Sequence, residues 1–267
     1  MTPSAESGPD AEGGDAAAPE AEAGTETQGR GERIAKWLAR AGVASRRDAE
    51  RLLTEGKVFV NGHRVDHPAT FVKPGDKVMM AGKAINAPDR TRLWRYHKPE
   101  GLVTTHRDPE DRPTVFQKLP AGMPRVVSVG RLDLSSEGLL LLTNDGALAR
   151  RLELPSNGWI RRYRARAWGA VEPSALARLA DGITIEGVKY GPIEATLEVR
   201  KNENVWIAVA LKEGRNREVR RVLAHLGLQV SRLIRVAYGP FQLGKLDPGS
   251  VDEVPGKVLR EQLPNVE

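Results

Sequence analysis

An aspartate and an arginine stand two residues apart in the segment Gly130–Gly146, GRLDLSSEGLLLLTNDG. The apolar run Leu139–Leu142 indicates a buried strand, and the Asn144-Asp145-Gly146 sequence indicates a turn after it. Asp133 and Arg131 would then lie on a loop attached to a rigid strand, where catalytic groups are commonly held. A carboxylate in such a place can act as a nucleophile or as a general base. The simpler alternative is that Asp133 only caps a turn.

Sequence patterns for several other enzyme chemistries are absent. The chain has no cysteine, which excludes disulfides, thiolate zinc sites and cysteine nucleophiles. Its five histidines are scattered and form no H-E-x-x-H motif, so we expect no metal. There is no phosphate-binding glycine loop of the G-x-x-x-x-G-K-[ST] or G-x-G-x-x-G type, and Leu134 stands where a nucleophile elbow needs glycine. Hydrolases, kinases and hydride-transfer enzymes therefore lose their common sequence support.

The charge of the chain is unevenly distributed. The net charge is +6, but residues 1–29 carry seven acids and no Lys or Arg, so the remainder stands at +13. A field of this sign favours partners that carry phosphate groups, although charge alone is equally compatible with simple solubility.

Residues 1–31 are predicted to be a disordered acidic tail, since they lack any apolar periodicity. The beginning of the chain has no basic segment followed by an apolar run, so no secretory signal is predicted. No stretch approaches the roughly 20 apolar residues of a membrane span. We therefore expect a cytoplasmic protein without membrane contact, and a monomer by default.

Two short helices followed by a small sheet are predicted for residues 32–82. Apolar residues spaced for one helical face begin at Ile34, and Gly42 ends that helix. Ser45 is predicted to cap the second helix, and Asn61-Gly62 to form a hairpin turn between short strands. Basic residues left for solvent in this region include Arg46, Arg47 and Lys57.

Residues 83–92, KAINAPDRTR, have the composition of a linker, and residues 93–262 read as a second domain. Short strand-like runs outnumber helical patterns there, which predicts an α+β domain with a mainly antiparallel sheet. The strand-like runs are Leu139–Leu142, Ile160–Trp168, Ala195–Val199, Val205–Leu211 and Val230–Val236, and the helical patterns are Pro173–Ala180 and Arg217–Leu226.

The first domain resembles a known RNA-binding module. The run RIAKWLARAGVASRRDAERLLTEGKVFVNGHRV is similar to the S4 RNA-binding domain in its Ala-Gly turn, its Ser-Arg-Arg helix start and its G-K-V-x-V-N-G strand and turn. The resemblance implies binding to structured RNA through shape and phosphate contacts, with Arg46, Arg47 and Lys57 among the contacting residues.

The second domain resembles an enzyme family. GRLDLSSEGLLLLTNDG looks like the signature of the RsuA/RluB family of ribosomal RNA pseudouridine synthases, in which the aspartate of G-R-L-D is essential. Further similar segments are Lys98–Gly101, Asp108–Phe116, Glu213–Arg221 and Gln229–Val236. The resemblance covers about Glu32 to Arg260.

Such enzymes break the N1–C1′ bond of uridine and rejoin the base through C5, which requires no cofactor. The resemblance implies that Asp133 acts on a uridine flipped out of folded RNA, either as a nucleophile or as a base toward the 2′ proton. Arg131 is expected to pair with Asp133 and to fill the space that the base leaves; its alternative role is an ordinary surface arginine.

Three other parts of the expected site rest on the same resemblance. Tyr163 aligns with an active-site tyrosine that stacks on the flipped base, whereas the pattern alone would suggest sheet packing. Arg220 is expected to reach the active site and pair with Asp133. Arg215 and Arg217 are expected to contact RNA phosphates, the alternative being a solvated basic helix face.

The expected partner is ribosomal RNA. EGRNREVRR and QVSRLIRVAYG look most like the family members that modify the large-subunit (23S) RNA. Two alternatives stay open. One is an enzyme acting on the small-subunit (16S) RNA, and the other is a non-catalytic S4-containing factor in ribosome assembly.

Overall fold

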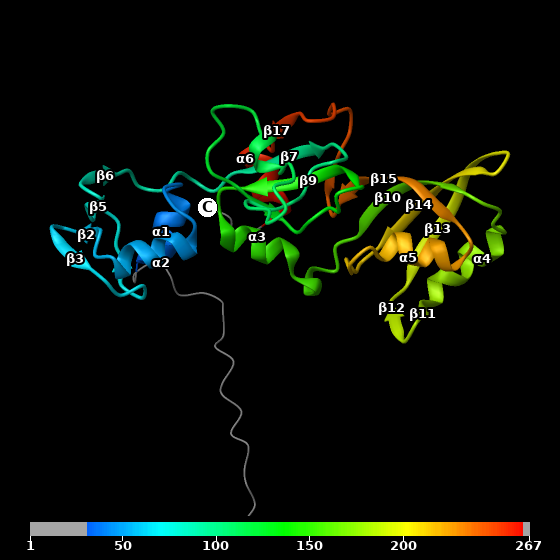
Figure 1. Ribbon diagram of the computed structural model, residues 1–267, viewed down its shortest axis with the longest axis horizontal. Coiled ribbons are helices and arrows are strands. Elements are labelled where there is room, and N and C mark those ends of the chain that lie inside the picture. Colours follow the sequence, from blue (N-terminus) through cyan, green and yellow to red (C-terminus); the bar gives the residue numbers. More distant parts are fainter. Residues whose placement is uncertain (1–30, 264–267) are drawn as a thin grey trace, which may run out of the picture.

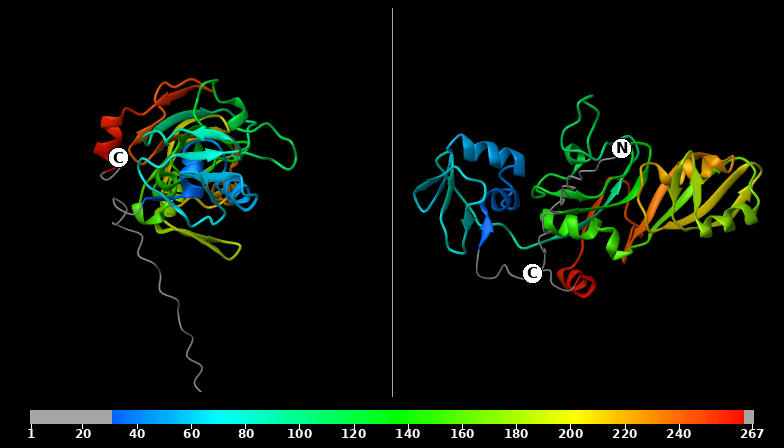
Figure 2. Two further views of the ribbon diagram at one scale, coloured as in Figure 1. Left: turned by 90° about the vertical axis from the view of Figure 1, so that its left-hand side faces the viewer. Right: turned by 90° about the horizontal axis from the view of Figure 1, so that it is seen from below.

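The computed structural model describes residues 31–263 (Figure 1). The predicted acidic tail, apart from its last residue, lies outside the described residues. The chain forms a small unit at one end of an elongated molecule and a larger one built on a long sheet (Figures 1 and 2). No helix within residues 31–263 is long and apolar enough to cross a membrane.

The small unit has two helices and two small sheets. The strands β2, β3, β5 and β6 form one sheet in the order β3-β2-β5-β6, and β1 pairs with β4. Its elements are β1 (Glu32–Arg33), α1 (Ile34–Arg40), α2 (Arg46–Thr54), β2 (Val58–Val60), β3 (His63–Val65), β4 (Phe71–Val72), β5 (Val78–Met80) and β6 (Lys83–Ile85).

The helix cap and the hairpin turn that the sequence predicts in this unit are confirmed. Ser45 caps α2, because its hydroxyl accepts a hydrogen bond from Asp48 N at 3.1 Å and donates to the Asp48 carboxylate at 2.6 Å. Asn61 and Gly62 both have positive φ and join β2 to β3. These contacts fix the start of α2, where Arg46 and Arg47 stand.

The predicted linker is shorter than residues 83–92. Lys83–Ile85 form β6 and pair with β5, so the connection to the larger unit comprises residues 86–92. Ala81 and Gly82 make the tight turn between these strands, both with positive φ. Alanine rarely adopts that conformation, so the residue types at this turn do not predict a hairpin.

The larger unit is a nine-stranded sheet with helices packed on it. The main strand order is β13-β14-β10-β15-β9-β7-β17, with β8 also paired to β9 and β16 to β15. The elements are β7 (Leu93–Lys98), β8 (Val127–Val129), β9 (Glu137–Thr143), α3 (Gly146–Glu153), β10 (Arg161–Trp168), α4 (Pro173–Ala177), β11 (Ile183–Ile185), β12 (Val188–Tyr190), β13 (Ile193–Lys201), β14 (Asn204–Leu211), α5 (Glu218–His225), β15 (Gln229–Tyr238), β16 (Phe241–Gln242), β17 (Val251–Glu253) and α6 (Gly256–Gln262), with 3-10 turns at Phe116–Lys118, Pro155–Asn157 and Arg178–Asp181.

The predicted α+β class and mainly antiparallel sheet are confirmed. The parallel pairing of β15 with β9 spans only two residue pairs, Ile234 with Glu137 and Arg235 with Gly138. This short junction joins two half-sheets with separate apolar cores. One core lies beneath α4 and α5, and the other contains residues of α3 and α6.

The turn predicted at Asn144-Asp145-Gly146 is wrong. Asp145 instead caps helix α3, since its carboxylate accepts from Ala147 N at 2.8 Å and from Leu148 N at 3.4 Å. Aspartate serves turns and helix caps equally well, so the local sequence did not distinguish them.

Candidate active site

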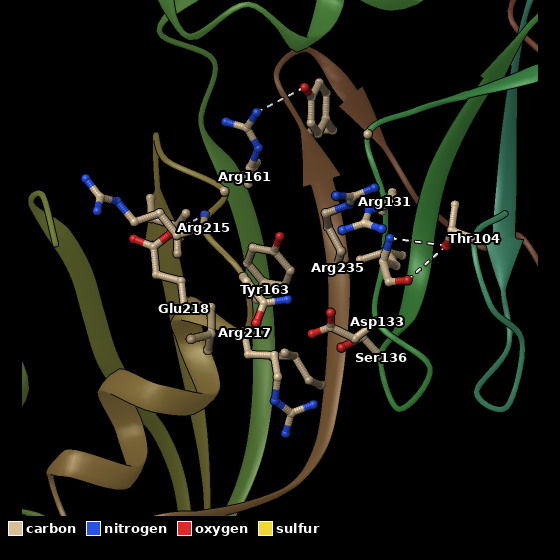
Figure 3. Close-up of a pocket in the computed structure, with 18 of the residues that line it drawn as sticks. Thr104, Arg131, Asp133, Ser136, Arg161, Tyr163, Arg215, Arg217, Glu218 and Arg235 are labelled. Atoms are coloured by element: carbon tan, nitrogen blue, oxygen red, sulfur yellow. Dashed lines mark hydrogen bonds between the residues drawn. The ribbon is translucent and has the colours of Figure 1, made fainter. Parts of the chain in front are cut away.

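A cavity of about 570 Å³ opens where the two half-sheets meet (Figure 3). Its walls come from β10, β15, the loop Gly130–Ser136 and the loop that precedes α5. The cavity therefore collects residues that are far apart in the sequence around one space large enough for a nucleotide.

The first part of the Asp133 loop is bound by two side chains. The Thr104 hydroxyl donates to Leu132 O at 2.9 Å and accepts from Leu132 N at 3.3 Å. Glu153, at the end of α3, accepts from Gly130 N at 2.7 Å. The main chain on the N-terminal side of Asp133 is thus fixed at two points, Gly130 and Leu132.

The second part of the loop is bound by two cations. Lys98, which is fully buried, donates from Nζ to Ser136 O at 2.7 Å and to Pro99 O at 3.0 Å. Arg220 donates to Ser135 O at 2.7 Å and to Val230 O at 2.9 Å. These bonds hold the main chain that follows Asp133.

Both cations also act on Asp133 electrostatically. Burial lowers the pKa of Lys98 to about 8, and the negative charge of Asp133 opposes that shift. Burial likewise lowers the pKa of Arg220, and the neighbouring Arg217 adds to the decrease while Asp133 opposes it. The carboxylate of Asp133 therefore lies within electrostatic reach of two cations that also bind its loop.

Tyr163 and Asp133 face the same cavity from opposite walls (Figure 3). Tyr163 is half-buried on β10, with its ring packed against apolar cores on both sides. Asp133 is half-buried on the loop. A planar base between them would meet an aromatic ring on one side and a carboxylate on the other.

Arginines supply most of the charge around this space. Arg131, Arg215 and Arg217 line the cavity together with Arg161 and Arg235. The expected ion pair between Arg131 and Asp133 is not among the contacts of residues 31–263. Arg131 is exposed, with its guanidinium near the Asp133 loop (Figure 3). Guanidinium groups in this number suit a polyanionic ligand.

Arg220 lies elsewhere than expected. It makes no ion pair with Asp133 within the described part of the chain, and it does not line the cavity. Its guanidinium instead binds main-chain carbonyls of the Asp133 loop and of β15. In this arrangement Arg220 contacts the main chain of the loop and not the carboxylate.

Comparisons with known proteins agree with this geometry. The family profile described as "RNA pseudouridylate synthase" matches residues 92–225, and the S4 domain profile matches residues 32–78. The chain is 46% identical over 230 residues to a Rickettsia felis protein named "Uncharacterized RNA pseudouridine synthase", covering 86% of this chain and 100% of the relative. The chain belongs to the RNA pseudouridine synthase family. The combination with an S4 domain identifies the RsuA/RluB branch.

Two further similarities extend over most of the synthase. It is 43% identical over 242 residues to "Ribosomal large subunit pseudouridine synthase B" of Haemophilus influenzae, covering 86% of this chain and 66% of the relative. A solved structure described as "Crystal structure of pseudouridylate synthase" is 26% identical, with a TM-score of 0.59 over 86% of this chain and 99% of the other. The S4 unit and the catalytic unit both fall within these matches.

The basic residues expected to contact RNA from the S4 domain are not at the cavity. Arg46 and Arg47 are exposed at the start of α2, and Lys57 is exposed just before β2. Arg46 approaches Glu50 at 3.7 Å and Lys57 pairs with Glu55 at 2.6 Å. In the synthase these residues form a separate basic surface.

Sequence reasoning missed several residues at the cavity. Arg235 is buried on β15, where its Nε donates to Leu139 O at 2.7 Å and its guanidinium lies 5.3 Å from the centre of the Tyr238 ring. The sequence did contain a signal for Arg235. It lies two residues from each of the apolar Leu233 and Ala237, which places all three side chains on the same buried side of β15. Thr104 and Glu153 gave none, since only the folded chain brings them to the Asp133 loop.

Proposed function

We propose that this synthase isomerises a specific uridine of large-subunit (23S) ribosomal RNA, with Asp133 as the catalytic carboxylate. The single observation that carries the proposal is the position of Asp133 and Tyr163 on facing walls of a cavity lined by arginines. The large-subunit assignment is supported by the 43% identity to the Haemophilus influenzae relative.

The target nucleotide enters the cavity by flipping out of the RNA. Arg215 and Arg217 bind its flanking phosphates, and Arg131 occupies the space that the base leaves in the RNA. The Tyr163 ring stacks on the flipped uracil. Each of these contacts orients the sugar toward Asp133, so that binding energy is used to position the reacting atoms.

The reaction then exchanges one bond for another. The N1–C1′ bond breaks, the uracil turns within the cavity, and C5 bonds to C1′. C5 loses its proton and N1 ends protonated, so the product is an isomer and no atom is added. Asp133 acts either as a nucleophile or as a base toward the 2′ proton, both of which need an ionised carboxylate. Lys98 and Arg220 hold the loop through Ser136 O and Ser135 O.

The test is a map of pseudouridines in ribosomal RNA. Cells that lack the synthase are complemented with the wild type, with Asp133→Asn and, as a matched control, with Asp181→Asn at an exposed position beyond α4. We expect one 23S pseudouridine to be missing, and to return with the wild type and the control but not with Asp133→Asn.

Other outcomes separate the parts of the proposal. Restoration by Asp133→Asn would show that this carboxylate is not catalytic. A missing pseudouridine in 16S RNA would leave the chemistry intact and overturn the large-subunit assignment.

A further inference from the structure

The side of β10 opposite the active site carries a row of arginines that ends in a tryptophan. Along this strand Tyr163, Ala165 and Ala167 point to the cores, and the residues between them point the other way. α4, α5 and the hairpin β11–β12 all lie on the first side in Figure 1. The outward residues Arg162, Arg164, Arg166 and Trp168 are all exposed.

Two of these arginines have side chains without a partner in the described part of the chain. Arg164 pairs with Glu198 at 2.8 Å, and its guanidinium lies 4.9 Å from the centre of the Trp206 ring on β14. The side chains of Arg162 and Arg166 make no hydrogen bond or ion pair with any residue between 31 and 263. Two positive charges are therefore left over on this surface.

The excess positive charge should destabilise the sheet, because of the residues that stand opposite it on the neighbouring strands. Arg166 stands directly opposite Arg232 on β15, and like charges in that position destabilise a sheet. Arg232 is compensated by an ion pair with Glu137. Glu194 on the edge strand β13 stands in the cross-strand row of Ala210 and Arg162, and not in that of Arg166. Arg166 thus remains available for an external anion.

Apolar rings lie beside the charges. The exposed fraction of Trp168 is 52%, which is high for the largest apolar side chain. Trp206 on β14 is half-buried and stands opposite Arg166. Val199, aligned with Trp206, is also exposed. A surface with unpaired guanidinium groups and accessible indole rings combines the two features that bind single-stranded nucleic acid.

We propose that this surface, the β10 outer face (Arg162, Arg164, Arg166, Trp168 and Trp206), binds a single-stranded segment of the substrate RNA outside the catalytic cavity. Residues four apart on a strand, such as Arg162 and Arg166, are separated by about 13.6 Å, a distance comparable with two phosphate repeats along an extended RNA strand. Arg162 and Arg166 bind phosphates, and a base stacks on Trp168.

RNA is favoured over a protein partner because it is the substrate of this family and because the unpaired charges of the face are positive. The proposal goes beyond the proposed function, since it does not depend on which ribosomal RNA is modified or on the role of Asp133.

The test measures binding of a short fluorescein-labelled oligouridylate to the full chain across a salt series. Arg162→Gln/Arg166→Gln removes the two unpaired charges. Arg178→Gln/Lys189→Gln removes two exposed charges on α4's side of the sheet and serves as the matched control. Each lost phosphate contact lowers the slope of log affinity against log salt by about 0.7, so we expect a decrease of about 1.4 for the first pair and none for the control.

Trp168 is tested separately. We expect Trp168→Ala to weaken binding at least about five-fold, the lower bound for stacking of one base, and Trp168→Phe to retain most of the affinity. Thermal melting checks that each variant is folded. The assay measures binding and no turnover, which keeps the result separate from the catalytic assignment.

Equal salt slopes for the two double variants would overturn the proposal. So would unchanged RNA affinity combined with a loss of self-association in sedimentation velocity, since that result would identify the β10 outer face as a protein contact.

Discussion

The Asp133 carboxylate depends on side chains that touch its loop and not the carboxylate itself. Thr104 and Glu153 bind the main chain before it, and Lys98 and Arg220 bind the main chain after it. Small displacements of a catalytic group are costly, because the reacting atoms must meet within a few tenths of an ångström. Residues that do not contact the carboxylate itself should therefore affect turnover.

Thr104 provides the first residue-level prediction. Thr104→Val removes both hydrogen bonds to Leu132 and leaves its main-chain groups without these partners, which costs about 1–3 kcal/mol of stability. We expect kcat to fall about ten-fold or more with KM for RNA nearly unchanged, since the loop shifts but the phosphate contacts stay. Thr104→Ser keeps the hydroxyl and should restore most of kcat. Unaltered turnover in Thr104→Val would show that this contact does not position Asp133.

Lys98 gives a prediction on pH. Its pKa is lowered from 10.5 to about 8 by burial, so the folded protein releases this proton near pH 8. Loss of the charge weakens the bond to Ser136 O and the field on Asp133. We expect kcat to decrease above pH 8, and we expect Lys98→Met to have a lower kcat without that decrease. Rate measurements from pH 6 to about 9.5, bracketing the lowered pKa, provide the check.

Stability should change in the opposite direction over the same range. Between pH 8 and 10.5 the unfolded chain holds the Lys98 proton and the folded chain does not, so this group makes the free energy of unfolding rise with pH. The difference between wild type and Lys98→Met in urea unfolding should therefore shift in favour of the wild type as pH rises. A parallel fall of rate and stability would instead indicate general alkaline unfolding.

At the scale of elements, the junction of β9 with β15 depends on one glycine. Gly138 has a φ of +104°, and a Cβ there would lie 2.3 Å from Arg235 O and 2.7 Å from Arg235 N. We expect Gly138→Ala to destabilise the protein by about 3 kcal/mol or more, because both the main-chain conformation and the close approach are lost. Gly146→Ala is the control, since that site in α3 is open, and we expect it to be neutral or stabilising by up to about 1 kcal/mol. Comparable melting temperatures for the two variants would contradict the assigned role of Gly138.

The sequence predicted elements well where one periodic signal was present. The strand runs around Leu139–Leu142 and Val205–Leu211 are strands β9 and β14, and the pattern at Arg217–Leu226 is helix α5. Predictions failed where one residue type serves two conformations, as Asp145 does in turns and helix caps. They also failed where an unusual residue makes a turn, as Ala81 does.

The predicted site was incomplete for a different reason. Asp133 and Tyr163 were found through resemblance, and both line the cavity. The expected ion pair between Arg220 and Asp133 is not present among the described residues. The sequence places Arg220 on a helix but does not determine which loop its long side chain will reach. Thr104 and Glu153 act through main-chain groups of Gly130 and Leu132, and no sequence pattern marks such contacts.

At the scale of the whole molecule, residues 86–92 join the S4 domain to the catalytic unit. The two units follow one another along the long axis (Figure 1). The exposed arginines of α2, the cavity and the β10 outer face are three separate basic surfaces. An RNA that contacts more than one of them gains affinity from their covalent connection.

The acidic segment of the chain should act against these basic surfaces. Residues 1–29 carry seven acids, and their removal changes the net charge from +6 to +13. These acids reduce the positive field and compete with phosphates for the arginines, so deletion of residues 1–29 should tighten RNA binding at low salt and have little effect at high salt. Turnover on protein-free ribosomal RNA should stay within a few-fold of the wild type. A full-length variant with the seven acids replaced by Gln and Asn should reproduce the tighter binding, since the effect is one of charge. If the deletion tightens binding and the neutral variant does not, the segment acts by its bulk; if turnover is abolished in the deletion, the segment takes part in catalysis.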